Sequence, residues 1–176
     1  MRMKNLANKI TVLRMILVPV FLALVYTGHR YIGCAVFIIA SLSDLADGII
    51  ARKYNQITVF GKFMDPLADK VLVLSAMCWL IESGQLPGWV VAIVLLREFA
   101  VSGMRLVAAG NNNVIAAGWS GKVKTASTMV AIILVILFPI KIHNIAAAVV
   151  IAGTTVYSGI EYFIVNKHVF TEEKKQ

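Results

Sequence analysis

The chain contains GWSGKVKTASTMVAIILVILFP at residues 118–139 and, after a short break, HNIAAAVVIAGTTVYSGIEYFIV at residues 143–165. An α-helix rises about 1.5 Å per residue, so each apolar run is long enough to cross roughly 30 Å of hydrocarbon. Four further apolar runs lie at approximately residues 10–27, 31–50, 66–82 and 88–109. The sequence therefore predicts an all-α integral membrane protein with six transmembrane helices.

The composition agrees with a membrane protein. Hydrophobic residues make up 59% of the 176 residues and the mean hydropathy is +0.81, which exceeds what a soluble domain of this length tolerates. The net charge of +8 is scattered between the apolar runs, and this pattern favours an anionic membrane face over nucleic acid as the partner. The breaks between runs are short and no internal repeat is present, so residues 1–176 are predicted to form a single membrane domain.

The distribution of basic residues predicts the orientation. Most lysines and arginines lie at one set of predicted helix ends, whereas the opposite loops hold only Arg30 and Lys141. The positive-inside rule therefore predicts that both termini, the segment of residues 43–70 and the loop at residues 105–125 are cytoplasmic. The basic start, MRMKNLANK, lacks a signal-peptide cleavage pattern, and we expect it to form a short amphipathic segment on the membrane. A short chain without a transit peptide suits a bacterial plasma membrane.

The segment SDLADGIIARKYNQITVFGKFMDPLADK, residues 43–70, holds four aspartates in a largely apolar chain: Asp44, Asp47, Asp65 and Asp69. A spacing of three or four residues projects each pair of carboxylates onto one helical face. Each pair is expected about 20 Å from the outer face, in the cytoplasmic third of the membrane. Four converging carboxylates would repel one another without a cation, and hard oxygen ligands suit two Mg²⁺ or Mn²⁺ ions.

Other interpretations of these aspartates are open at this point. The carboxylates could form structural salt bridges with Arg52, Lys62, Lys70 or Arg97. They could also line the ion path of a cation transporter, because intramembrane carboxylates usually mark function. An ion path would not require Gly48, Arg52 or a fixed gap to Gly61. A structural membrane scaffold would explain none of the charges.

A longer pattern around the aspartates carries a family resemblance. The sequence DLADGIIAR at residues 44–52, followed after eight residues by GKFMDPLAD at residues 61–69, resembles the signature of the CDP-alcohol phosphatidyltransferases at every fixed position. The resemblance implies six transmembrane helices with a cytoplasmic active site. It also implies a reaction in which an alcohol hydroxyl attacks the lipid-linked phosphorus of a CDP-alcohol and CMP is released.

The resemblance implies a role for each residue of the motif. Asp44 and Asp65 would bridge both metal ions, and Asp47 would bind one of them. Asp69 would contact the other ion and act as the base on the attacking hydroxyl. Gly48 would let the nucleotide approach the helix closely, and Arg52 would hold a phosphate oxygen. Weaker candidates for nucleotide contact are Asn8, Thr11 and Thr58. No serine or cysteine stands beside a histidine as an activated nucleophile, so direct transfer is expected.

Basic residues outside the motif are candidates for binding a phosphorylated acceptor: Arg97, Arg105, Lys122 and Lys124. The segments NKITVLRMILVP, REFAVSGMRLVAA and VIAAGWSGKVKT resemble the phosphatidylglycerophosphate synthases within the family. This closer resemblance implies CDP-diacylglycerol as the donor, glycerol 3-phosphate as the acceptor, and a homodimer.

Alternatives to these acceptor assignments are also open. Lys122 and Lys124 could be ordinary positive-inside anchors, and Arg97 could form a buried ion pair with Glu98. Neighbouring helical positions point about 100° apart, so only one of the two lysines could face a cavity. Phosphatidylinositol-phosphate and phosphatidylserine synthases are the nearest alternative enzymes.

Overall fold

The computed structural model describes residues 4–53, 59–110, 115 and 118–167. Within these ranges, the backbone alone is described for residues 4–11, 44–53, 59–66 and 69. The described chain forms six α-helices and contains no strand: α1 Lys4–Tyr26, α2 Arg30–Lys53, α3 Val59–Glu82, α4 Gly88–Gly110, α5 Trp119–Leu137 and α6 Lys141–Val165. The predicted all-α fold with six helices is confirmed. By length and composition, two helices of the described chain, α5 and α6, are apolar enough to cross a membrane.

The N-terminal segment that was predicted to be amphipathic is helical where the structure describes it. Residues 4–9 are the first turns of α1, which continues without interruption to Tyr26. The residues from Lys4 to Lys9 include good helix formers and no helix-breaking residue, so nothing in their local chemistry ends the helix there. Their side chains are outside the described part of the structure, so the amphipathic character predicted for this segment stays a prediction.

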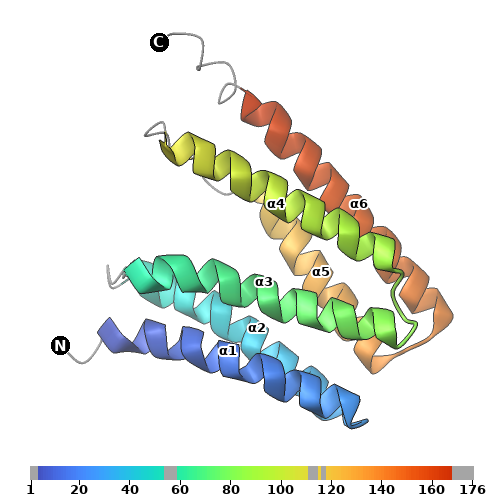
Figure 1. Cartoon of the computed structure of the whole chain (residues 1–176). Coiled ribbons are helices and arrows are strands. Elements are labelled where there is room, and N and C mark those ends of the chain that lie inside the picture. Colours follow the sequence, from blue (N-terminus) through green and yellow to red (C-terminus); the bar gives the residue numbers. More distant parts are fainter. Residues whose placement is uncertain (1–3, 54–58, 111–114, 116–117, 168–176) are drawn as a thin grey trace.

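The helices run alternately up and down, so that the start of α1 and the end of α6, the terminal helix ends, lie at one end of the bundle (Figure 1). Two of the turns at the opposite end are built around glycines with positive φ, Gly28 at 86° and Gly84 at 71°. In each turn the residue after the glycine donates its N–H to a carbonyl five residues earlier, His29 to Leu24 and Gln85 to Leu80, both at 2.8 Å. This arrangement satisfies the last carbonyls of a helix and reverses the chain tightly.

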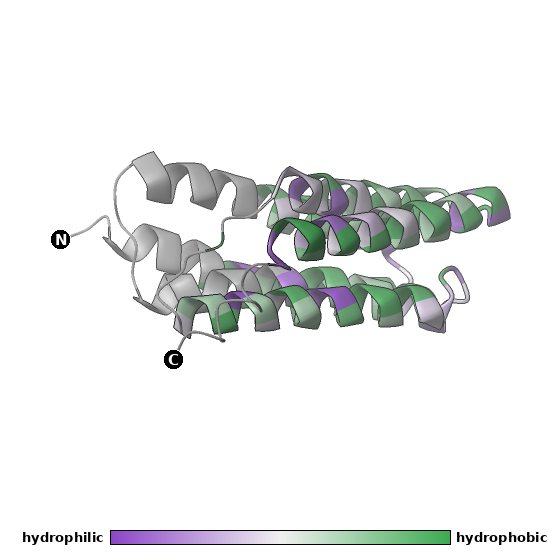
Figure 2. Ribbon diagram, turned by 90° about the horizontal axis from the view of Figure 1, so that it is seen from above, coloured by the Kyte–Doolittle hydropathy of each residue, from purple (hydrophilic) through white to green (hydrophobic). Residues whose placement is uncertain are grey.

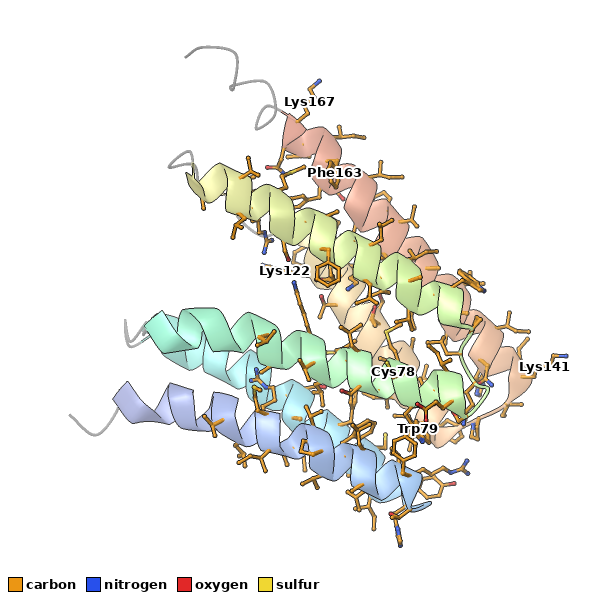
Figure 3. The ribbon with its side chains drawn as sticks, viewed as in Figure 1. Cys78, Trp79, Lys122, Lys141, Phe163 and Lys167 are labelled. Carbon is orange, nitrogen blue, oxygen red and sulfur yellow. The ribbon has the colours of Figure 1, made fainter. Side chains whose placement is uncertain are left out.

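The helices fall into two groups. Helices α1, α2 and α3 pack on one another, and α4 and α6 pack together. The groups are joined by α5, which contacts α2, α3 and α6, and by a contact between α3 and α4. Figure 1 shows the groups closest at the turn end and diverging toward the end where α1 begins and α6 ends. Figure 3 shows Lys141 at the turn end of α6 and Lys167 just beyond its other end.

Apolar side chains lie both inside and outside the bundle. The core includes large side chains that are completely buried: Phe21, Phe37, Leu72, Leu80, Ile132, Ile136 and Ile151. Other large apolar side chains are strongly exposed, with Leu106 at 78% and Phe99 at 73%. Figure 2 shows hydrophobic residues along most of each described helix, with hydrophilic residues scattered among them. A surface of this kind fits contact with lipid better than contact with water.

Candidate active site

The four motif aspartates lie on two helices that pack against each other. Asp44 and Asp47 belong to α2, and Asp65 and Asp69 belong to α3. Their segments are helical, as the predicted spacing argument requires. Their side chains are outside the described part of the structure, so metal binding stays a prediction. Among the side chains that are described, no three acidic, cysteine or histidine residues are grouped to hold a metal ion.

The side chains of the candidate nucleotide-binding residues are also outside the described part of the structure. Asn8 and Thr11 lie in α1, and Gly48 and Arg52 lie in α2, but only the backbone of these segments is described. Thr58 lies outside the described residues altogether. The predicted roles of all five residues in CDP binding therefore stay predictions.

The described polar site is centred on Glu98 of α4. Its Oε1 atom lies 2.8 Å from Lys124 Nζ of α5 and 3.0 Å from Arg97 Nη1, while its Oε2 atom lies 3.3 Å from Lys70 Nζ of α3. We call these four residues the Glu98 cluster. Three cations and one carboxylate leave two positive charges in the cluster, so it would attract an anionic ligand.

Arg97 is held between helices on the inner side of the cluster. Besides its bond to Glu98, its Nη2 atom donates to Ser158 Oγ of α6 at 2.6 Å. A side chain at Gly121 or Gly159 would place a Cβ atom 3.3 Å from the arginine, so these glycines leave the space that it occupies. The predicted ion pair between Arg97 and Glu98 is present, and it is partly buried. The geometry gives Arg97 the role of a structural link among α4, α5 and α6.

Lys124 is buried and borders a cavity. The residue is only 5% exposed, and its ammonium group donates to Glu98. The cavity, of about 50 Å³, lies between α3, α4 and α5. Its polar lining consists of Lys70, Glu98, Lys124, Thr125 and Thr128. Because a buried ammonium is costly without a partner, the placement of Lys124 is decided by this cluster rather than by anchoring at a membrane surface.

Two other predicted acceptor residues lie elsewhere. Lys122 is exposed, and its Nζ atom lies 5.8 Å from the centroid of the Trp119 ring. Arg105 is also exposed; it donates from Nε to Tyr162 Oη at 3.0 Å, and its Cζ atom lies 5.5 Å from that ring centroid. Among the described contacts, neither residue touches the Glu98 cluster. The structure thus brings Arg97 and Lys124 together through Glu98, but it does not join Arg105 or Lys122 to them.

The sequence interpretation missed several residues of this site. Lys70 was considered only as a partner of the aspartates, yet its described ionic partner is Glu98, and it also donates to Ser102 Oγ at 2.8 Å. Glu98 was considered only as a partner of Arg97. The available signal was a glutamate inside the apolar run at residues 88–109, where a carboxylate needs cationic partners.

Arg14 of α1 is a buried charged side chain that the sequence interpretation did not single out. It is 1% exposed, and α1 packs against α2 and α3, the two helices that carry the motif aspartates. A lone arginine within the apolar run at residues 10–27 was the signal, because a buried guanidinium is costly unless other groups compensate its charge.

Comparison with known proteins identifies the family. The model of the CDP-alcohol phosphatidyltransferase family matches residues 4–157. The chain is 40% identical to the CDP-diacylglycerol–glycerol-3-phosphate 3-phosphatidyltransferase of Bacillus subtilis, over 93% of this chain and 96% of that protein. It is 44% identical to a probable phosphatidylglycerophosphate synthase of Mycobacterium tuberculosis, over 92% of this chain and 81% of that protein. It is 35% identical to the Escherichia coli protein with the same name as the Bacillus enzyme, over 90% of this chain and 92% of that protein. The resemblance of residues 44–69 is confirmed, and the chain belongs to the CDP-alcohol phosphatidyltransferase family.

Proposed function

We propose that this protein transfers the phosphatidyl group of CDP-diacylglycerol to glycerol 3-phosphate, giving phosphatidylglycerophosphate and CMP. The observation that carries the proposal is the similarity of more than 90% of the chain to enzymes named for this reaction. The positive charge of the Glu98 cluster supports an acceptor that carries a phosphate.

The motif residues fit a divalent metal centre. Two packed helices supply only carboxylate ligands, two from α2 and two from α3, and hard oxygen ligands suit Mg²⁺ or Mn²⁺. Asp44, Asp47, Asp65 and Asp69 would hold two ions. When bound, the ions supply neutralisation of the pyrophosphate charge, so that a second anion can approach.

Other residues of the chain bind the nucleotide and accept the proton. Gly48 and Arg52, with Asn8, Thr11 and Thr58 as weaker candidates, bind the CDP group. Asp69 accepts the proton of the acceptor hydroxyl. The hydroxyl oxygen forms a bond to the phosphatidyl phosphorus while the bond from that phosphorus to CMP breaks, so CMP leaves with the electron pair. No covalent enzyme intermediate is needed.

The predicted acceptor residues contribute unequally to phosphate binding. Lys124 has the strongest support, since it is buried and borders a cavity. Arg105 and Lys122 are exposed and would at most guide the anionic acceptor toward the site. Arg97 supports the site through Glu98 and Ser158.

The same proposal includes six membrane spans in a bacterial plasma membrane, with both termini and the active site in the cytoplasm. Six helices of 19 to 25 residues support this topology, as do the basic residues concentrated at the end where α1 begins and α6 ends. The protein is proposed to act as a homodimer.

The test is a transfer assay with purified protein in detergent. CDP-diacylglycerol, Mg²⁺ and radiolabelled glycerol 3-phosphate should give labelled lipid and an equal amount of CMP, and chelation of the metal should stop both. Serine and inositol phosphate serve as competing acceptors in parallel reactions. Better use of either one would reject glycerol 3-phosphate as the acceptor, and no CMP release with any acceptor would reject the enzyme assignment in favour of a transporter or scaffold.

A further inference from the structure

Glu98 is the one described carboxylate that joins cations from three different helices. Lys70 comes from α3, Arg97 from α4 and Lys124 from α5, and all three lie within 3.3 Å of a Glu98 oxygen. The glutamate itself borders the cavity between these helices. Its position is therefore suited to setting the geometry of the cations around that cavity.

We propose that Glu98 is the positioning residue of the acceptor site. It holds Lys70 and Lys124 at the cavity, and these two lysines, rather than Arg97, bind the phosphate of the acceptor. This inference rests on the proposed function and refines it, because it adds Lys70 to the acceptor site and moves Arg97 out of it.

The donor groups of the three cations support this division. A lysine ammonium has three N–H donors. In the described contacts, Lys124 Nζ donates to Glu98, and Lys70 Nζ donates to Ser102 while lying beside Glu98, so each has donor capacity for a ligand. Arg97 bonds Glu98 through Nη1 and Ser158 through Nη2. It too keeps unused donors, including a buried Nε without a described partner, but its side chain is enclosed beside Gly121 and Gly159. Both lysines line the cavity, and Arg97 is absent from its described lining.

Removing the Glu98 charge is expected to lower the affinity for the acceptor phosphate. The loss of a carboxylate makes the region more positive, which by itself would favour an anion. However, the Lys124 side chain is only 6% exposed, and a buried ammonium without a counter-charge is strongly unfavourable. Lys124 and Lys70 would also repel each other once the group between them became neutral. The lysines would leave their positions, and the affinity for the acceptor phosphate would fall.

Lys70 places the proposed phosphate site and the proposed base on the same turn of one helix, although neighbouring side chains point about 100° apart. Lys70 directly follows Asp69, the proposed base, on α3. A phosphate held by Lys70 and Lys124 would anchor one end of the acceptor, so that its hydroxyl end is oriented for proton removal. Fixing the acceptor in this way lowers the entropic cost of reaching the reactive arrangement.

The experiment compares Glu98→Gln and Glu98→Asp with the native enzyme in substrate titrations. Glu98→Gln should raise the KM for glycerol 3-phosphate by about tenfold or more, because charge-assisted contacts to the phosphate are lost. The KM for CDP-diacylglycerol should stay within about twofold. Glu98→Asp keeps the negative charge on a side chain that is one methylene shorter. Its affinity for the acceptor should therefore lie between those of Glu98→Gln and the native enzyme. Glu82→Gln, at the C-terminal end of α3 and outside the Glu98 cluster, is the matched control and should leave both KM values unchanged.

A second measurement separates this inference from the identity of the acceptor. Inorganic phosphate should raise the unfolding temperature of the native protein and of Glu82→Gln, but Glu98→Gln and Lys70→Ala should lose this protection. If glycerol 3-phosphate proves not to be the acceptor and the loss of protection is still seen, the proposed reaction fails and the role of Glu98 stands. Native phosphate protection in Glu98→Gln, or native acceptor KM in both Glu98 variants, would overturn the inference. If Glu98→Gln does not fold, an unchanged acceptor KM in Glu98→Asp overturns it equally.

Discussion

The two charged regions of this molecule are encoded differently in the sequence. The motif aspartates lie within residues 44–69, on two helices joined by a short connection. The Glu98 cluster is assembled from α3, α4 and α5, and its lysines are far apart in the chain. A motif within one helical pair can be recognised by its spacing, whereas a cluster from three helices becomes visible only when the helices are packed.

This difference also separates two kinds of function. The aspartates are proposed to act on the nucleotide donor and the chemical step, and the Glu98 cluster on binding of the acceptor. Substitutions in the first region should therefore lower kcat, and substitutions in the second should raise the KM for the acceptor. The following experiments test whether the two regions are separable in this way.

The largest effect is expected for the metal ligands. Asp44→Asn or Asp65→Asn removes a charge shared by both proposed ions, and metal ions supply several kcal/mol of transition-state stabilisation, so turnover should fall by more than about a thousandfold. The readout is CMP release at saturating substrates, with thermal unfolding in detergent as the control for folding. Activity within about tenfold of the native enzyme would contradict the metal assignment.

The next effect is expected at the proposed base. Asp69→Asn should lower kcat by about a hundredfold or more, as loss of a general base does, and should change the KM for CDP-diacylglycerol much less. Single-turnover measurements would separate binding from the chemical step. If binding of CDP-diacylglycerol weakened as much as turnover, Asp69 would be only a ligand.

A smaller effect, confined to the acceptor, is expected for Lys124. Lys124→Ala should raise the KM for glycerol 3-phosphate by roughly tenfold to a hundredfold, because a hydrogen bond to a charged group contributes about 1.5–3 kcal/mol. Lys122→Ala is the matched control: it removes the same charge two positions away on α5, from an exposed side chain beside Trp119. Equal effects of the two substitutions would mean that general surface charge, rather than the Glu98 cluster, binds the acceptor.

Arg105→Ala provides an intermediate comparison. Arg105 is exposed and bonded to Tyr162, so its loss should raise the acceptor KM less than the loss of Lys124. A larger effect than that of Lys124→Ala would place the phosphate nearer to the Gly110 end of α4.

The smallest effects are expected for the two serines that accept hydrogen bonds from the Glu98 cluster, Ser102 and Ser158, and the two effects should differ in kind. Ser102→Ala removes a partner of Lys70 and should raise the acceptor KM by roughly twofold to tenfold, because one hydrogen bond contributes about 0.5–1.5 kcal/mol. Ser158→Ala removes a partner of Arg97 and should lower the unfolding temperature while leaving that KM nearly unchanged. The reverse pattern would return Arg97 to the acceptor site and remove Lys70 from it.

The sequence alone predicted the helices well, because the length of an apolar run is a local property. The run at residues 88–109 corresponds to α4 at Gly88–Gly110, and the run at residues 118–139 corresponds to α5 at Trp119–Leu137. Helix α1 begins at Lys4, before the apolar run predicted at approximately residues 10–27, although the composition changes from polar to apolar at the start of that run. Backbone hydrogen bonding continues through such a change when no helix-breaking residue is present.

The motif aspartates and the family were also available from the sequence, since the spacing of residues within one helix fixes the face on which they lie. Only the tertiary structure showed that Lys124, and not Lys122, contacts Glu98, that Lys70 contacts the same carboxylate, and that Arg97 links α4 to α6. These assignments depend on the rotation of each helix about its axis and on the helices beside it. A buried charge finds its partners on other helices, so its role is set by packing between segments that are distant in the sequence.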